Sequence, residues 1–102
     1  MKAKIVRDRI PEIIMNSGKN PIIEIVSIDA AINGLEQKLN EELNEYLEDH
    51  SLEEMADLLE VMHGILHLKG ISWEELESVR LKKREERGGF EQRILLKDIQ
   101  EG

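Results

Sequence analysis

The sequence contains no cysteine and few aromatic residues. The absence of Cys from all 102 residues excludes disulfides and thiolate zinc sites, and it fits a reducing compartment. The aromatic residues are Tyr46, Trp73 and Phe90, so the core must be built from Ile, Leu, Val and Met, which suit helix packing. A chain of this length is expected to form a single domain over residues 1–102.

Long hydrophobic runs are also missing. No stretch approaches the ~20 apolar residues that span a membrane, and the opening segment MKAKIVRDRIPEII has no long apolar run before its charges. We therefore expect a cytoplasmic protein without a membrane partner. The 22 acidic residues outnumber the 14 basic ones, and the formal net charge of -8 opposes binding to a nucleic-acid backbone. An acidic chain is expected to attract cations. The basic residues, however, gather toward the two ends of the chain, where they suit the binding of a small polyanion.

Two helix starts are marked by capping boxes, in which a Ser accepts from a backbone amide and the fourth residue reaches back. They stand as Ser51-Leu-Glu-Glu54 and Ser72-Trp-Glu-Glu75. Gly70 ends the first of these helices, and the pair Gly88-Gly89 ends the second.

The segment before Ser51 has the spacing of an amphipathic helix. Apolar residues recur there at intervals of three and four, which predicts a helix over about residues 29–48; they are Ile32, Leu35, Leu39, Leu43, Tyr46 and Leu47. Residues 2–8 are expected to be extended, and Pro11 suits the first turn of a short helix that ends near Gly18. The prediction is a mainly α-helical bundle built around an antiparallel helix hairpin.

A small β element is expected beside this bundle. The stretch Pro21–Ser27 is rich in Ile and Val and bounded by turn residues, and Phe90–Leu96 is its expected partner. The helix after Ser51 is apolar around much of its circumference, and a domain this small buries a limited share of its surface. We therefore expect a homo-oligomer, either a homodimer or a homotetramer.

Acidic side chains lie at the edges of the predicted apolar faces. At about 100° per residue, Glu42 falls beside the apolar stripe of its helix and Glu45 follows on the same flank. On the next helix Glu54 and Asp57 also fall beside apolar positions. Unpaired burial of a charge is costly, so such acids need a cation, a hydrogen-bond network or a raised pKa.

Folding the chain at residues 49–50 brings the acids of the two helices together. The fold sets Glu45 opposite Glu54 and Glu42 opposite Asp57. Because each pair is spaced i, i+3, four carboxylates can converge on one point. Magnesium takes oxygen ligands and commonly keeps waters while bridging to substrate phosphates, which suits an open carboxylate cluster.

The alternative is that these acids belong to a solvated surface. Pairs of Glu at i, i+3 arise easily among 22 acidic residues, and Glu54 already serves as the acid of a capping box. His63 and His67 are spaced i, i+4, but no HExxH pattern surrounds them, so packing is favoured over zinc binding. On spacing alone, both interpretations of the carboxylates stay open.

These acids resemble the signature of the all-alpha nucleotide pyrophosphohydrolase superfamily, which includes MazG-like proteins, dimeric dUTPases and phosphoribosyl-ATP pyrophosphohydrolase. The signature is ExxE followed by ExxD, and it stands here as Glu42-Leu-Asn-Glu45 and Glu54-Met-Ala-Asp57. The segments KIVRDRIPEII and KKREERGGFEQRI are similar to a small MazG-like subgroup labelled phosphoribosyl-ATP pyrophosphohydrolase-like. The likeness covers nearly the whole chain.

The resemblance implies an oligomeric helical bundle with four magnesium ligands, Mn²⁺ being an alternative ion. The ligands would be Glu42, Glu45, Glu54 and Asp57. It also implies hydrolysis of a nucleoside triphosphate between its α and β phosphates, giving the monophosphate and pyrophosphate. Residues expected at the phosphates are Lys38, Lys83 and Arg87, with Arg7 and Arg9 closing over the nucleotide.

The substrate stays open at this stage. Eight residues separate Glu45 from Glu54, fewer than in most MazG proteins, which leaves less surface for recognising a base. Phosphoribosyl-ATP, a deoxynucleotide or an unwanted nucleotide removed from the pool are the candidates. The competing hypothesis is a non-catalytic helical module that binds a nucleotide or a protein.

Overall fold

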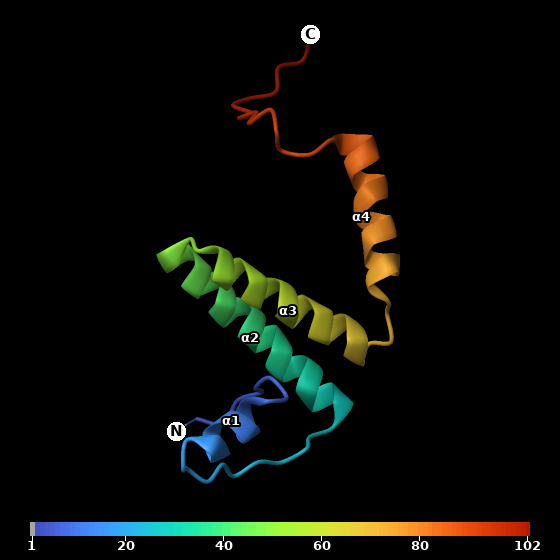
Figure 1. Ribbon diagram of the computed structural model, residues 1–102. Helices are drawn as coiled ribbons and strands as arrows, with labels where there is room; N and C mark the ends of the chain where they lie inside the picture. The colour runs from blue at the N-terminus through green and yellow to red at the C-terminus, as the bar shows by residue number, and fades with distance from the viewer. Residues whose placement is uncertain (1) are drawn as a thin grey trace. The chain divides into compact units, whose positions relative to one another are not determined.

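The protein is a helical chain in two compact units, as seen in a computed structural model that describes residues 2–102. The helices are α1 (Ile10–Asn16), α2 (Ile28–Asp49), α3 (Leu52–Leu68) and α4 (Trp73–Arg87) (Figure 1). Helices α1 to α3 belong to the unit that ends at Ile71, and α4 belongs to the unit Ser72–Gly102. No helix among these residues has the length and apolar character needed to cross a membrane. A single domain over residues 1–102 stays a prediction.

Serine caps begin the three long helices. The Ser51 hydroxyl accepts from the Glu54 amide at 3.2 Å, and the Ser72 hydroxyl accepts from the Glu75 amide at 3.1 Å. These bonds confirm the two predicted helix starts. Ser27 caps α2 in the same way, accepting from the Ala30 amide at 3.1 Å, although the residue pattern had not predicted this cap. Each cap satisfies one of the amides that a helix N-terminus leaves without an internal partner.

The turn between α2 and α3 falls at the predicted position, residues 49–50, and it is tight. His50 ends α2 with φ 55° and ψ 23°, a left-handed conformation that reverses the chain within two residues. Its ring contacts Tyr46 edge to face, with 5.5 Å between centroids. The two helices consequently run antiparallel and pack side by side in Figure 1.

The α2–α3 contact forms the core of the first unit. Val61 is the buried apolar residue among positions 2–102, with 5% of its surface exposed. Gly64 faces Leu35 so closely that a Cβ there would lie 3.1 Å from Leu35 Cδ1. The missing side chain at Gly64 lets the helices approach, but the resulting core is thin. The hairpin predicted from the sequence is therefore present.

The N-terminal segment is anchored on α2. Residues 2–8 form neither helix nor strand, so their expected extended backbone stays a prediction, and Ile5 lies against Gly34. A Cβ at Gly34 would overlap Ile5 Cγ1, so only glycine leaves room for this contact. The short helix α1 then begins at Ile10, with Pro11 in its first turn.

The predicted β element is not confirmed, because no segment of residues 2–102 forms a strand. Pro21–Ser27 is irregular, and two of its side chains, Ile22 and Ile25, are 97% and 91% exposed. Phe90, at the start of the expected partner, is also 97% exposed. An isolated pair of strands is marginal in water unless one face packs on a core. The Ile and Val content of Pro21–Ser27 therefore did not suffice to form a strand.

Candidate metal centre

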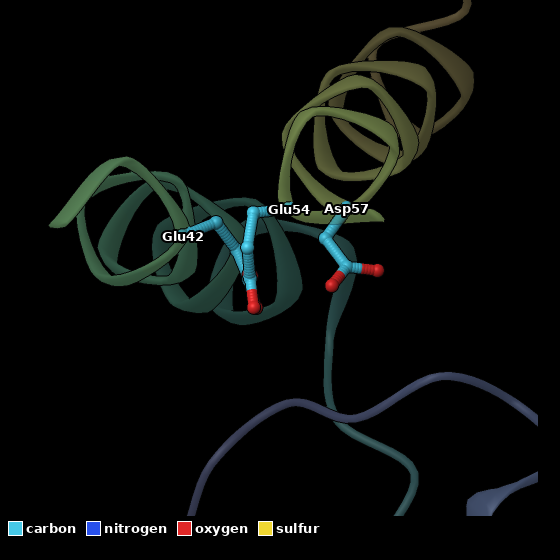
Figure 2. A group of neighbouring side chains, drawn as sticks. All are labelled: Glu42, Glu54 and Asp57. Carbon is cyan, nitrogen blue, oxygen red and sulfur yellow. The ribbon is translucent and has the colours of Figure 1, made fainter. Parts of the chain in front are cut away.

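Three carboxylates from the hairpin meet beside the α2–α3 contact. Glu42 comes from α2, and Glu54 and Asp57 come from the first turns of α3 (Figure 2). One carboxylate oxygen from each side chain lies within 4.8 Å of the other two. The Ser51 cap and the His50 turn place the start of α3 next to Glu42, so the local sequence produces this convergence.

Glu42 is buried although it is charged. Its exposed fraction is 8%, and its Oε2 atom has no hydrogen-bond partner. Oε1 lies 3.8 Å from Lys38 Nζ, one turn earlier on α2. Burial, followed by contact with Glu45, raises the pKa of Glu42, while Lys38 opposes this rise. The orphaned oxygen is therefore a strong acceptor in a place that water does not reach.

Glu54 has a second orphaned oxygen. Its backbone amide completes the Ser51 cap, but its carboxylate Oε2 is buried without a hydrogen-bond partner. Burial and the negative charge of Glu45 raise the pKa of Glu54. The capping-box explanation thus accounts for the backbone of Glu54, whereas its carboxylate lies with Glu42.

The fourth predicted acid, Glu45, lies beside this group. Its charge and its hydrogen-bonding contact raise the pKa of both Glu42 and Glu54. Glu45 is exposed and does not belong to the set of oxygens within 4.8 Å of one another. The structure therefore brings all four predicted acids into one neighbourhood and places three of them in direct range of a common ion.

The donor set fits a hard divalent cation. Two buried carboxylate oxygens have no proton donor, and an adjacent carboxylate adds a third oxygen. Repulsion among such charges is unfavourable unless a proton or a cation compensates it. Oxygen donors without nitrogen or sulfur are the ligands of magnesium, calcium and manganese.

Basic side chains border the carboxylates. Arg7 Nη2 donates to Asp57 Oδ1 at 2.6 Å across 50 positions of sequence. A cavity of about 250 Å³ opens beside this ion pair, and its lining residues are Lys4, Val6, Arg7, Ile10, Lys38, Glu42 and Asp57. Lys4 was missed by the sequence analysis, because nothing in the sequence distinguishes it from an ordinary exposed lysine.

Arg9, another predicted phosphate-binding residue of the first unit, does not line this cavity. The Arg9 side chain is 84% exposed and contacts Glu12 at 3.4 Å. Lys83 and Arg87 lie on α4 in the second unit, so their contact with a nucleotide stays a prediction. In that unit Arg87 lines a cavity of about 310 Å³ together with Phe90 and neighbouring residues.

Part of the basic face of α4 is neutralised by acids. Arg80 pairs with Glu77, and Arg84 pairs with Glu91 at 2.5 Å. Each of these arginines forms the hydrogen bond that holds the pKa of its Glu below the usual range. The cluster of basic residues seen in the sequence therefore offers fewer free charges than its composition indicates.

Comparison with known proteins finds a partial match to a bacterial protein whose description names no function. No family model matches the sequence, and no solved structure matches it. A protein of Mycolicibacterium smegmatis (strain ATCC 700084 / mc(2)155), described only as uncharacterized, is 49% identical over 43 residues. This match covers 42% of the chain and 44% of the M. smegmatis protein, so the chain matches less than half of that relative's length.

Proposed function

We propose that the protein is a metal-dependent nucleotide pyrophosphohydrolase. The reaction would be hydrolysis of a nucleoside triphosphate to the monophosphate and pyrophosphate. The observation that carries the proposal is Glu42, a buried carboxylate that has one orphaned oxygen and that brings an oxygen within 4.8 Å of oxygens of Glu54 and Asp57. This geometry supports the interpretation of the ExxE and ExxD motifs as one site. We also propose a cytoplasmic location, where nucleotides are abundant.

The roles follow from the positions of the side chains. Glu42, Glu54 and Asp57, with Glu45 beside them, would hold Mg²⁺ or Mn²⁺. A bound divalent ion neutralises charge on phosphate oxygens and lowers the pKa of the attacking water. Lys38 lies next to this group and lines the cavity, where it would attract and orient the polyphosphate.

Pyrophosphate release is the direct test of this function. Purified protein would be incubated with Mg²⁺ and natural and damaged nucleoside triphosphates, deoxynucleotides and phosphoribosyl-ATP. We expect one substrate class to release pyrophosphate and EDTA to stop the release. Phosphoribosyl-ATP as the best substrate would assign the histidine-pathway type of reaction, whereas damaged nucleotides would assign removal of unwanted nucleotides.

The competing function is a non-catalytic helical module. The ion pairs from Arg7 to Asp57 and from Lys38 to Glu42 favour it, because they compensate two of the acids without a metal. No pyrophosphate release across the panel, together with a melting temperature that Mg²⁺ and Mn²⁺ leave unchanged, would support the module and reject the enzyme.

We further propose that the hairpin pairs with a second copy of this chain. Large apolar side chains remain exposed along one side of it: Leu43, Leu47, Leu52, Met55, Leu59 and Met62. At about 100° per residue, these positions lie about 120° around each helix from the residues of the α2–α3 contact. Because the helices are antiparallel, both stripes fall on the face opposite to Asp57 and Lys38. A second copy there would cover apolar surface and leave the carboxylates accessible.

Leu59→Lys is expected to convert the oligomer into a monomer, because Leu59 is 44% exposed at the centre of the α3 stripe and a buried charge disfavours association. Size-exclusion chromatography with light scattering would measure the mass. Glu53→Lys introduces the same side chain elsewhere on α3 and should leave the mass unchanged. A monomeric wild-type protein would contradict the pairing.

A further inference from the structure

The ion pair between Arg7 and Asp57 occupies one of the candidate metal ligands. Asp57 Oδ1 accepts from Arg7 Nη2 at 2.6 Å, and Asp57 is also one of the three acids whose oxygens converge. Both side chains are partly open to solvent, with 52% of Arg7 and 41% of Asp57 exposed. A guanidinium and a divalent cation would therefore compete for the same carboxylate.

Arg7 lies in a segment without regular secondary structure, and contacts on both sides of Arg7 keep this segment beside Asp57. Ile5, two residues before Arg7, packs on Gly34 of α2, and this contact fixes the segment on the hairpin. α1 begins three residues after Arg7, where the Ile10 amide donates to the Arg7 carbonyl at 3.0 Å. The backbone is thus restrained on both sides of Arg7, while its long side chain remains free to change partners.

The cavity that Arg7 and Asp57 both line offers the Arg7 side chain a second partner. The cavity of about 250 Å³ is lined by three cationic side chains, Lys4, Arg7 and Lys38, with Glu42 and Asp57 at its acidic side. Cations beside carboxylates that can hold a metal ion provide complementary charge for a phosphate bridging the two. Val6 and Ile10 supply the apolar part of the wall.

We propose that Arg7 exchanges partners during binding. In the metal-free protein its guanidinium neutralises Asp57. When a divalent cation binds Asp57, the guanidinium releases this carboxylate and binds a phosphate group in the same cavity, beside Lys4 and Lys38. This inference rests on the proposed function, and it adds Lys4 and the exchange at Asp57. Repulsion between the bound cation and the guanidinium displaces Arg7 from Asp57. The negative charge of the phosphate then stabilises the guanidinium in its new position.

The exchange predicts opposite effects of one substitution on two ligands. Arg7→Met removes the competitor, so Mn²⁺ should bind about twofold to fivefold tighter, the range that an exposed ion pair supports. The same variant loses a charge-assisted bond to phosphate, so pyrophosphate in saturating Mg²⁺ should bind about tenfold to a hundredfold weaker. Isothermal titration calorimetry measures both affinities without turnover.

Two matched variants separate the exchange from a general loss of charge. Lys4 lines the cavity and makes no ion pair with an acid among residues 2–102, so Lys4→Met should weaken pyrophosphate and leave Mn²⁺ unchanged. Lys2 is exposed and outside the cavity, so Lys2→Met should change neither affinity. Circular dichroism at 222 nm would verify that all variants are folded.

The Mn²⁺ and pyrophosphate affinities of the variants decide between the exchange and its alternatives. The exchange is supported if Arg7→Met is the one variant that combines tighter Mn²⁺ binding with weaker pyrophosphate binding. Unchanged or weaker Mn²⁺ binding by Arg7→Met, in a protein whose wild type binds Mn²⁺, overturns the exchange and leaves the metal site standing. Absence of Mn²⁺ binding in the wild type and all variants overturns the metal site, and the exchange with it.

Discussion

Glu42→Gln is expected to lower magnesium-dependent pyrophosphate release at least about 100-fold, since even residues outside the ligand shell of metal sites can cost up to that factor. The same substitution should increase the free energy of unfolding of the metal-free protein at pH 7 by about 1 kcal/mol, because it removes a buried negative charge with an orphaned oxygen. In a domain of this size, that gain corresponds to a rise in melting temperature of about 4–8 °C.

Glu41→Gln is the matched control for this prediction. Glu41 is the preceding residue of α2, and it carries the same charge but is exposed. Its substitution should leave the rate unchanged and shift stability by less than about 0.5 kcal/mol. A stabilised but inactive Glu42→Gln would show that Glu42 serves function at a cost in stability. If Glu42→Gln is destabilised and retains activity, Glu42 is instead a structural partner of Lys38.

The stability of the metal-free protein is expected to fall as pH rises above the ordinary carboxylate range. The pKa values of Glu42 and Glu54 are raised by burial and by neighbouring acids, so the folded state binds more protons than the unfolded state in this window. Their stabilisation is complete below the ordinary carboxylate pKa of 4.5 and is lost as pH rises through the higher folded pKa values. Thermal unfolding in EDTA, followed at 222 nm, would measure this decrease.

Two acids of the second unit contribute a pH dependence of stability with the opposite sign. The pKa values of Glu77 and Glu91 are lowered by hydrogen bonds from arginine, so their stabilisation is present above the ordinary value and is lost as pH falls through the lowered values. Stability should therefore be greatest near the ordinary carboxylate pKa in EDTA. As pH falls through the lowered pKa values, the ion pairs of α4 are lost. As pH rises above the ordinary value, Glu42 and Glu54 of the hairpin lose their protons and repel the neighbouring acids.

Magnesium should reverse the slope in the upper part of this range. A metal ion binds the deprotonated carboxylates, so its affinity, and with it the stability of the loaded protein, rises with pH. Glu42→Gln should flatten the decrease seen in EDTA, because it removes one of the two titrating groups. A stability that rises between about pH 5 and 7 in EDTA would mean that Arg7 and Lys38 outweigh the burial of the acids.

The helices were predictable because their signals are local. Ser51 and Ser72 cap helices where the capping boxes predicted them, and His50 reverses the chain within the expected turn. The Ser27 cap was missed because no acid at the third helical position accompanies it. The predicted strands at Pro21–Ser27 and Phe90–Leu96 did not form, because a strand depends on a distant partner that the local sequence does not specify.

The carboxylate cluster was predictable in part. The i, i+3 spacing of the acids and the chain reversal at residues 49–50 suffice to place Glu42, Glu54 and Asp57 on facing sides of a hairpin. Spacing does not show which of four acids is buried, and it left the capping role of Glu54 as an alternative. The structure distinguishes them, because Glu42 and Glu54 have orphaned oxygens whereas Glu45 is exposed.

By itself, the sequence determined the helices, the turn between α2 and α3 and the alignment of the acids, since hydrogen bonds and side-chain periodicity within a few residues decide all three. The tertiary structure alone decided that Arg7 meets Asp57 and that Lys4 joins Lys38 at one cavity. The physical reason is the seating of Ile5 on Gly34, a contact between residues 29 positions apart that only the packed hairpin offers.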